Sequence, residues 1–428
     1  MSSRGVIVVG GGAAGFFAAI TCAEAAPKTK VTILEKSSQF LSKVRISGGG
    51  RCNVTHACFD ARELSLRFPR GEQALIGPFQ RFQASDTVAW FESRGVKLKT
   101  ESDGRMFPVS NLSETIIDCL VNAAKAAGVK LVANCGVDRV KIIERAARPL
   151  DPKNERAGRP FYDGFELTVS NGETLACDRL LLATGGCRTA AAGQLAVSLG
   201  HTLEPPVPSL FTFHSTAVWL RDLAGISVEV VEAWVPGTKL RERGALLVTH
   251  AGLSGPVILR LSAWGARVLH DRDYQFMVHL NWLPHLSAEE IAVALNTRRE
   301  QQPAKLVVNT PLAPLPARLW ERLVLTAGVE PDTRWSRLTR TAQHRLVQQL
   351  IRTEVPVTGK SLNKDEFVTC GGVRLGEVDF KTMESRICPG LHFAGELLDI
   401  DGTTGGFNFQ SAWTTGWLAG RAMAIGRV

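Results

Sequence analysis

The sequence predicts an α/β fold in which a Rossmann-like dinucleotide-binding domain is interrupted by a β-rich, barrel-like domain that carries a small helical insert. Three observations predict it: a strand, glycine turn and helix near the start of the chain, a similar pattern near its end, and a change in the spacing of apolar residues between them. The chain has 428 residues, more than one hydrophobic core usually organises, so several domains are expected.

The first pattern is a phosphate-binding motif. Gly10, Gly12 and Gly15 match G-x-G-x-x-G directly after a β-branched run. Small and apolar residues continue over Ala13–Ala26 as a helix, whose N–H groups and positive dipole end suit phosphates. A second buried strand ends at Glu35, the spacing of an acid that binds ribose hydroxyls. The motif predicts dinucleotide binding and leaves NAD and FAD open, whereas a turn that only packs would leave Glu35 unexplained.

The next elements extend the same domain. Apolar spacing predicts a helix over Thr115–Gly128, and alternation predicts strands over Val129–Ile143. The charged segment Arg145–Gly164 is rich in proline and glycine and is expected to be a hairpin loop, followed by the strand "FELTVS". A buried strand from Arg179 then ends on the bare turn Thr184–Gly186.

After Ala190 the spacing of apolar residues changes twice. Short alternating runs up to about residue 283 predict an antiparallel or barrel-like unit, and helical spacing follows from Ser287 to about Arg352. Within the helical block, "SAEEIAVALNTRR" begins at an N-cap serine and "PARLWERLVLTAG" ends at a C-cap glycine. The predicted domains are residues 1–190 with 353–428, residues 191–284, and residues 285–352.

The last pattern, Leu391–Ala424, contains a strand, a glycine-broken loop and a helix of small and apolar residues. Gly405, Gly406 and Asn408 lie at the helix start, and Glu396 stands at the end of the strand. This second helix N-terminus and second acid suit the ribityl chain and the carbonyl edge of a flavin. FAD explains both ends of the chain, whereas NAD explains one.

The sequence resembles the bacterial FAD flavoproteins of the NAD(P)/FAD-dependent oxidoreductase type (YhiN type, aminoacetone-oxidase-like), within the glutathione-reductase- and fumarate-reductase-like superfamily. The resemblance spans almost the whole chain and is carried by "GGGAAG" with "LEK", "ISGGGRCNVT", "LLLATGG", "GALLVTHAGLSGPVILRLS" and "FAGELLDIDGTTGGFNFQSAWTTG". It implies an FAD domain split by a β-rich domain that holds a small helical insert.

The resemblance also implies which residues contact FAD. Gly12, Ala13 and Ala14 would lie on the pyrophosphate. Glu35 would bind the adenosine ribose, and Val137 would supply backbone to the adenine. The other residues implied to line the cofactor are Gly10, Gly15, Lys36, Lys43, Gly49, Gly50, Arg51, Cys52, Asn53, Thr184, Gly185, Gly395, Glu396, Asp401, Gly405, Gly406, Phe407 and Asn408.

Four residues are candidates for catalysis: Arg51, Cys52, Asn53 and His250. Arg51 could favour a thiolate at Cys52, and Arg51 and Asn53 could hold either a substrate carbonyl or flavin oxygens. Cys58 follows Cys52 at i+6, not at the i+5 spacing of flavin disulfide reductases, which favours a structural Cys52 over a redox pair. His250, in "THAGLSGP", is interpreted as either a proton donor or a structural hydrogen-bonding residue. No metal-ligand spacing is found.

These features predict an FAD-dependent oxidoreductase that moves a hydride or electron pair between flavin and a small substrate, by amine or aminoketone oxidation or by enone reduction. No second dinucleotide motif is present, so any NAD(P)H that serves as electron donor is expected to visit the flavin transiently instead of occupying its own domain. The alternative is an RNA-modifying or RNA-binding flavoprotein that uses the cationic side chains of residues 298–352. A third hypothesis is a flavin-bound sensor without turnover.

Composition indicates which compartment and which partners to expect for the protein. Nine scattered cysteines without a C-x-x-C pair predict a reducing cytoplasm, not a disulfide framework. No signal or membrane segment is expected, because glycines interrupt the apolar run Val6–Ile20. The net charge of +9 is interpreted as a solvated basic surface, since no cationic block is continuous. A nucleic-acid or membrane partner is therefore not expected, and the oligomeric state is left open.

Overall fold

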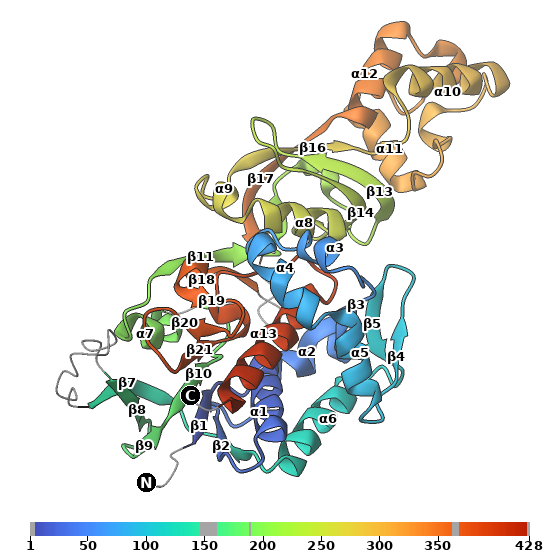
Figure 1. The fold of residues 1–428 in the computed structure, drawn as a ribbon. Helices are drawn as coiled ribbons and strands as arrows, with labels where there is room; N and C mark the ends of the chain where they lie inside the picture. The colour runs from blue at the N-terminus through green and yellow to red at the C-terminus, as the bar shows by residue number, and fades with distance from the viewer. Residues whose placement is uncertain (1–4, 146–160, 188–189, 362–367, 426–428) are drawn as a thin grey trace. The chain divides into compact units, whose positions relative to one another are not determined.

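The sheet predicted around the N-terminal motif lies in the first of two units (Figure 1). The computed structural model describes residues 5–145, 161–187, 190–361 and 368–425. The sheet has the strand order β19-β20-β21-β10-β1-β2-β6, and its five strands from β21 to β6 are parallel. The strands are β1 (Val6–Val9), β2 (Val31–Leu34), β6 (Lys130–Val132), β10 (Arg179–Leu182), β19 (Val378–Asp379), β20 (Glu384–Ser385) and β21 (Leu391–Phe393).

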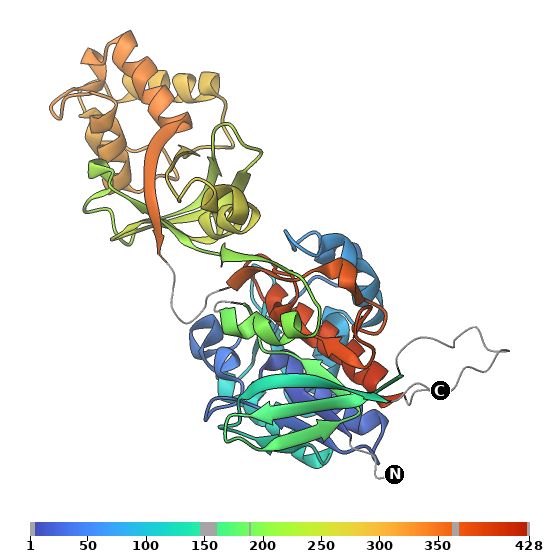
Figure 2. The ribbon, with the colours of Figure 1, turned by 90° about the vertical axis from the view of Figure 1, so that its left-hand side faces the viewer.

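Further helices and three smaller sheets complete the first unit, and Figure 2 shows the sheet of β7, β8 and β9 in teal and green. The helices are α1 (Ala13–Ala25), α2 (Ser42–Gly50), α3 (Ala61–Ser65), α4 (Glu72–Arg81), α5 (Ala84–Glu92), α6 (Ser113–Ala126), α7 (Ala190–Ser198), η4 (Leu375–Glu377), η5 (Gly395–Leu397) and α13 (Phe407–Ala424). The strands are β3 (Thr55–His56), β4 (Leu98–Thr100), β5 (Arg105–Pro108), β7 (Val137–Arg145), β8 (Phe161–Val169), β9 (Thr174–Cys177), β11 (Leu203–Ser209) and β18 (Val368–Val373).

Helices α1 and α13 come from opposite ends of the chain and lie side by side (Figure 1). Their contact is close because glycines of α13 face the backbone of α1. A Cβ at Gly416 would lie 2.6 Å from the carbonyl oxygen of Ala14, and one at Gly420 would lie 2.4 Å from that of Ala18. The residue numbers of the two contacts rise together along both helices, so the helices run parallel. Both helices begin at the end of the sheet where the cofactor is predicted to bind.

The second unit is a closed barrel with helices, which confirms the barrel-like unit and the helices that the sequence patterns predict. The barrel order is β12-β15-β14-β13-β16-β17, and neighbouring strands pair antiparallel all round the barrel. Its strands are β12 (Thr212–Ser215), β13 (Ser227–Trp234), β14 (Arg241–Thr249), β15 (Gly252–Ser254), β16 (Phe276–Asn281) and β17 (Thr353–Ser361). The helices are η1 (Val218–Leu220), α8 (Pro256–Trp264), α9 (Ala266–His270), α10 (Ala288–Gln301), η2 (Val307–Asn309), α11 (Ala317–Thr326), η3 (Trp335–Arg337) and α12 (Arg340–Ile351).

The predicted helix signals of the second unit are confirmed. Ser287 is the N-cap of α10, and it exchanges hydrogen bonds with Glu290 in a capping box. Gly328 follows α11 with φ of +74°, a backbone conformation that favours glycine. Buried Trp320 and Trp335 belong to the apolar core that the helices share with the barrel.

The two units divide the chain at residues 207/208 and 367/368, whereas the sequence places these boundaries at 190 and 353. The second boundary moves because β17 pairs with both β12 and β16 and closes the barrel. Residues 146–160 of the expected loop Arg145–Gly164 lie outside the described residues, although β7 and β8 pair as a hairpin around them. Among the described residues, no helix is both long and apolar enough to cross a bilayer.

Candidate functional site

The phosphate motif forms a bare turn between β1 and α1. Gly10 has φ of +111°, and a Cβ there would lie 2.2 Å from the carbonyl oxygen of Ala183. A Cβ at Gly15 would lie 2.0 Å from the carbonyl oxygen of Gly10, so turn and packing both require glycine. At Gly12, by contrast, no atom of the described residues beyond its chain neighbours lies within 4 Å of the missing Cβ, and none of their side chains caps α1. The open space beside Ala13 and the uncapped N–H groups fit a phosphate.

Glu35 follows β2, and backbone groups hold its carboxylate in place. Oε2 accepts a hydrogen bond from Gly11 N at 2.8 Å, and Oε1 accepts from Ser37 N at 2.9 Å and Ser37 Oγ at 2.8 Å. The carbonyl of Glu35 accepts from Cys135 N at 2.8 Å, so the chain just before Val137 lies beside the acid. Because a carboxylate has about four lone-pair sites, one remains for a ribose hydroxyl.

The turn after β10 borders a buried hydroxyl that sequence inspection misses. Thr184 and Gly185 follow β10, and within the described ranges no atom beyond the chain neighbours lies within 4 Å of the missing Cβ of Gly185. Thr369, on β18, is 2% exposed, and its Oγ1 has no hydrogen-bond partner within the described part of the chain. A Cβ at Gly186 would lie 2.7 Å from that hydroxyl and 3.5 Å from Glu396 Oε2. Burying an unpaired hydroxyl costs about 1–3 kcal/mol, which favours a polar ligand beside Thr369.

The three glycines of "ISGGGRCNVT" break α2. After Ser47, the chain passes through Gly48, Gly49 and Gly50 with φ of +59°, +67° and +82°. Residues other than glycine rarely adopt a positive φ at three successive positions. In the part of the chain that the structure describes, no atom beyond the chain neighbours lies within 4 Å of the missing Cβ of Gly49 or Gly50, so the backbone faces open space there.

An ion pair joins this segment to the C-terminal one. Lys43 Nζ, on α2, donates to Glu396 Oε2, on η5. The same short helix begins at Gly395, where a Cβ would lie 2.9 Å from the Cβ of Ala14. Residues near the start of the chain, in α2 and near the end of the chain therefore meet at the beginning of α1. Lys36, the other lysine predicted to line the cofactor, is exposed.

Arg51 has its charge balanced by a neighbouring acid. Its Nη1 donates to Glu101 Oε1 at 2.7 Å, and its guanidinium lies 4.0 Å from the ring centroid of Phe107. Arg105 approaches the other oxygen of Glu101 at 3.3 Å. A carboxylate shared by two arginines holds Arg51 in place and reduces its effect on Cys52.

Cys52 is fully buried, with φ of +58°. Burial raises the pKa of its thiol to about 12, and a hydrogen bond with Ser47 offsets little of that rise. Both Cys52 and Cys58 are free thiols. Burial favours the structural interpretation of Cys52, since a nucleophilic or redox cysteine acts as an accessible thiolate.

We predict that native protein at pH 8 leaves Cys52 unmodified by N-ethylmaleimide while the half-buried Cys58 is alkylated. A pKa raised from 9.0 to about 12 lowers the thiolate fraction about a thousandfold. Peptide mass spectrometry measures both positions, and denatured protein is the control in which both react. Equal native labelling of the two cysteines would contradict a buried, protonated Cys52.

Asn53 connects the glycine segment to the start of α13. With its amide oriented to satisfy both ends, Nδ2 donates to Thr55 O at 3.0 Å and Oδ1 accepts from Gly406 N at 2.9 Å. A Cβ at Gly406 would lie 2.6 Å from Thr55 O, so this junction has no room for a side chain. The Asn53 amide therefore holds backbone, and its predicted contact with flavin or substrate remains a prediction.

His56 is a second residue that sequence inspection misses. Its ring stacks on Phe407 with centroids 4.7 Å apart. Nε2 lies 3.1 Å from the carbonyl oxygen of Asp103, which only accepts, so Nε2 carries the proton. Burial lowers the pKa of His56, and Nδ1 is buried without a partner among the described residues. The ring is thus neutral and keeps a buried acceptor beside Phe407, at the start of α13.

Two polar side chains of the C-terminal loop are held by protein groups. Asp401 is fully buried and forms a bidentate ion pair with Arg70, through Nε at 2.5 Å and through Nη2. Asn408 accepts from Gly402 N at 2.8 Å and donates to Gly402 O at 3.0 Å. Gly405 has φ of +129°, and a Cβ there would lie 2.9 Å from the ring of Phe407, so this position favours glycine. Arg70 carries no sequence signal, because it lies 331 positions from its partner.

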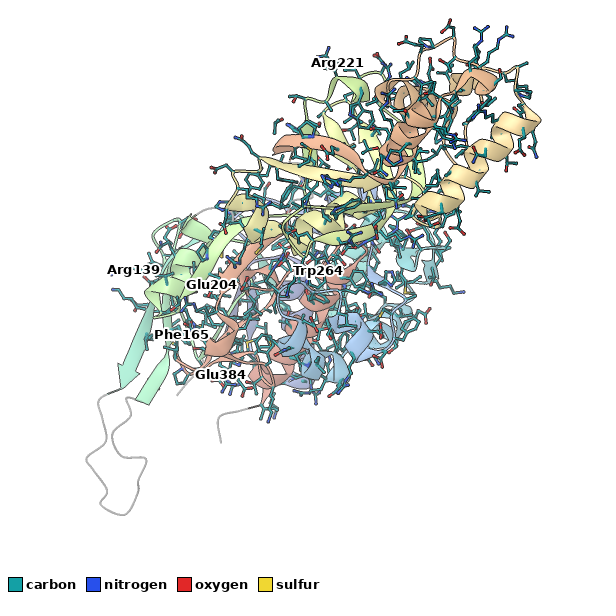
Figure 3. The ribbon with its side chains drawn as sticks, turned by 90° about the horizontal axis from the view of Figure 1, so that it is seen from above. Arg139, Phe165, Glu204, Arg221, Trp264 and Glu384 are labelled. Atoms are coloured by element: carbon teal, nitrogen blue, oxygen red, sulfur yellow. The ribbon has the colours of Figure 1, made fainter. Side chains whose placement is uncertain are left out.

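His250 lies in the second unit, exposed on the turn between β14 and β15. The structure therefore gathers Arg51, Cys52 and Asn53 in the first unit and places His250 in the other. A separate cavity of about 380 Å³ is lined by Arg139, Val140, Lys141, Ile142, Ser198 and Leu199 and contains none of the predicted site residues. Arg139, labelled in Figure 3, is exposed there.

The residues of the first unit fit FAD. Open backbone at Gly12, Gly49 and Gly185 leaves room for a ligand, and the uncapped N-termini of α1 and α13 favour phosphate and carbonyl oxygens. The unpaired hydroxyl of Thr369 and the carboxylate of Glu396 supply polar groups for hydroxyls or ring atoms.

Comparison with known proteins agrees with this geometry. The chain matches the family described as HI0933-like protein Rossmann domain over residues 4–422. It is 28% identical over 425 residues to a 3-dehydro-bile acid delta(4,6)-reductase of Clostridium scindens, covering 97% of this chain and 98% of the relative. It is 31% identical over 420 residues to a ribosomal RNA dihydrouridine synthase of Escherichia coli, covering 96% of each.

A solved structure shares the fold. The crystal structure of 3-ketosteroid delta1-dehydrogenase from Sterolibacterium denitrificans superposes with a TM-score of 0.51 and 13% identity, covering 98% of this chain and 99% of that one. At that identity the likeness concerns the arrangement of elements alone.

Proposed function

The chain belongs to the HI0933-like Rossmann family and is an FAD-dependent oxidoreductase, and we propose that it adds hydrogen to a carbon–carbon double bond conjugated with a carbonyl group. The observation that carries this proposal is the pair of relatives that span nearly the whole chain. One is named for reducing delta-4 and delta-6 double bonds of a 3-dehydro bile acid, and the other for making dihydrouridine. Both names describe saturation of a double bond conjugated with a ring carbonyl, which favours enone reduction over amine oxidation.

Bound FAD, once reduced by the electron donor, would supply the hydride, and the residues of this chain would bind and orient the cofactor and the substrate. The start of α1 at Gly12 and Ala13 would hold the pyrophosphate, and Glu35 the ribose. Lys43 would hold Glu396 in place for polyol hydroxyls through the ion pair between the two side chains. The N-terminus of α13 would stabilise negative charge on a carbonyl edge, because its dipole is positive there.

The electron donor is proposed to be NADH or NADPH. One G-x-G-x-x-G motif is present and the FAD pyrophosphate would occupy it, so the nicotinamide would visit without a domain of its own. A donor of this kind leaves after hydride transfer, and the oxidised substrate then takes its place.

The test is anaerobic mixing of the FAD-loaded protein with NADH or NADPH, followed by a conjugated ketone. We expect bleaching of the flavin absorbance by one of the two, and recovery of absorbance on adding a steroid 4,6-dien-3-one. The saturated 3-ketone is the matched control and should leave the flavin reduced. Recovery with the control, or bleaching by aminoacetone with no response to NAD(P)H, would overturn the reductase assignment in favour of an oxidase.

A second candidate substrate is uridine in RNA. It is favoured by the Escherichia coli relative, which is named for ribosomal RNA, and by the ten lysines and arginines of residues 285–352. The uracil C5–C6 double bond is conjugated with a carbonyl, so the same reaction class applies. Reoxidation of the reduced flavin by an RNA transcript, with dihydrouridine detected by nucleoside mass spectrometry, would select this substrate. An RNA that leaves the flavin reduced would exclude it.

A further inference from the structure

The helical part of the second unit carries lysine and arginine side chains that form few ion pairs with acidic side chains. Residues 285–352 contain ten lysines and arginines and six acidic residues, a net charge of +4. Elsewhere many arginines pair with carboxylates, as Arg70, Arg94 and Arg260 do. Among residues 285–351 no lysine or arginine forms a salt bridge, and Arg352 pairs with Glu354 at the end of the segment.

Five of these cations are brought together by backbone contacts. We call Arg299, Lys305, Arg334, Arg337 and Arg340 the basic face. Trp335 N donates to the carbonyl of Lys305 at 3.0 Å, and Leu306 and Arg334 form an isolated β-bridge, so the two segments lie side by side. Arg337 ends η3, Arg340 begins α12, and Arg299 lies in the last turn of α10, which packs against η3.

The backbone under the basic face is held by buried tryptophan. Trp335 is fully buried, and its Nε1 donates to Thr310 Oγ1 at 2.6 Å. Lys305, Arg334, Arg337 and Arg340 are exposed on this support, and Arg299 is partly buried. A rigid base lowers the entropy lost when several cations bind one ligand.

The first turn of α12 adds to the positive potential. Its N-cap is Thr339, whose side chain accepts from Ala342 N, and the turn contains Arg340 and no acid. Nine of the ten cations in the segment are arginines, and a guanidinium contacts phosphate oxygens through two parallel hydrogen bonds. The pattern fits a row of phosphates. Buried Trp320 and Trp335 offer no ring for base stacking, so backbone contact is the expected mode.

We propose that the basic face binds the phosphate backbone of RNA, which rests on the RNA candidate of the proposed function. Contacts with phosphates position an RNA without reading its sequence. The face therefore acts as a docking surface that concentrates RNA on the enzyme, and it takes no part in hydride transfer.

The test uses full-length FAD-loaded protein and a fluorescein-labelled RNA hairpin in an anisotropy titration at several salt concentrations. The variant Arg337→Glu/Arg340→Glu is expected to bind at least about tenfold more weakly. Its slope of log affinity against log salt should be shallower by about 2, since each lost phosphate contact removes about one. Both side chains are exposed, and a glutamate at position 340 suits a helix N-terminus, so the fold is expected to persist.

The matched control is Lys239→Glu/Arg272→Glu, which makes the same charge change at exposed positions of the same unit. It should keep most of the affinity, and Arg337→Gln/Arg340→Gln should fall between wild type and the glutamate variant. Equal losses in the two glutamate variants would reduce the effect to net charge and overturn the basic face. Binding to phosphatidylserine vesicles but not to the hairpin would replace RNA with a membrane surface.

The outcomes separate this inference from the proposed function. Wild-type protein that binds no RNA, yet reoxidises its flavin with a dienone, would overturn docking and leave enone reduction standing. RNA affinity that is unchanged in the glutamate variant, together with reoxidation by RNA, would overturn the basic face and retain the RNA substrate.

Discussion

Replacing Gly12 with aspartate is expected to give a folded protein that binds FAD at least about a hundredfold more weakly than wild type. Among the residues that the structure describes, none beyond the chain neighbours has an atom within 4 Å of the missing Cβ, and φ of −93° suits any residue, so the side chain costs the fold little. It would occupy the space predicted for the pyrophosphate and place a negative charge there. Like charges in contact cost several kcal/mol, and about 2.8 kcal/mol is a hundredfold. Quenching of FAD fluorescence in a titration measures the affinity.

Two variants control this experiment. Gly376→Asp introduces the same residue where open space surrounds a glycine of η4, outside the predicted cofactor residues, and it should retain FAD. Gly10→Ala should destabilise the protein itself, because its Cβ would meet the carbonyl of Ala183 at 2.2 Å and its φ is +111°. If Gly12→Asp protein is purified with a full complement of flavin, the phosphate site does not lie at this turn.

Replacing Arg70 with methionine is expected to lower the free energy of unfolding by about 3–5 kcal/mol. Asp401 has a fully buried side chain, and removal of its bidentate partner leaves a charge in the interior. Methionine retains much of the apolar volume of arginine, so the loss reports on charge rather than on a cavity. Urea unfolding of the FAD-free protein, followed by tryptophan fluorescence, measures the change.

The exposed pair between Arg374 and Glu204 provides the matched control. Glu204, labelled in Figure 3, lies on β11, and the two side chains are 54% and 33% exposed. Arg374→Met is expected to cost at most about 1 kcal/mol, because solvent screens the pair. In Arg70→Met/Asp401→Leu, removal of both charges should recover part of the loss. Equal losses in Arg70→Met and Arg374→Met would show that burial does not strengthen the Asp401 pair.

The elements around the cofactor site were accessible from the sequence because their signals are local. Glycine spacing, β-branched runs and an N-cap serine act within a few residues of the structure that they specify. The strand, turn and helix at Gly10–Gly15 and the N-cap at Ser287 are therefore found where they were predicted. The second unit boundary differs from the predicted one because closure of the barrel by β17 depends on pairing with β12 and β16, and "TEVPVTGKS" itself carries no sign of those partners.

The sequence by itself determined the α/β class, the barrel and helical textures and the bare backbone at Gly12 and Gly49. The tertiary structure alone decided which polar groups are satisfied and which are left for a ligand. It buries Cys52, commits Asn53 to Gly406 and leaves the hydroxyl of Thr369 unpaired among the described residues. The physical reason is that burial and hydrogen-bond partners arise from segments distant in sequence, whereas backbone preference belongs to each residue and its immediate neighbours.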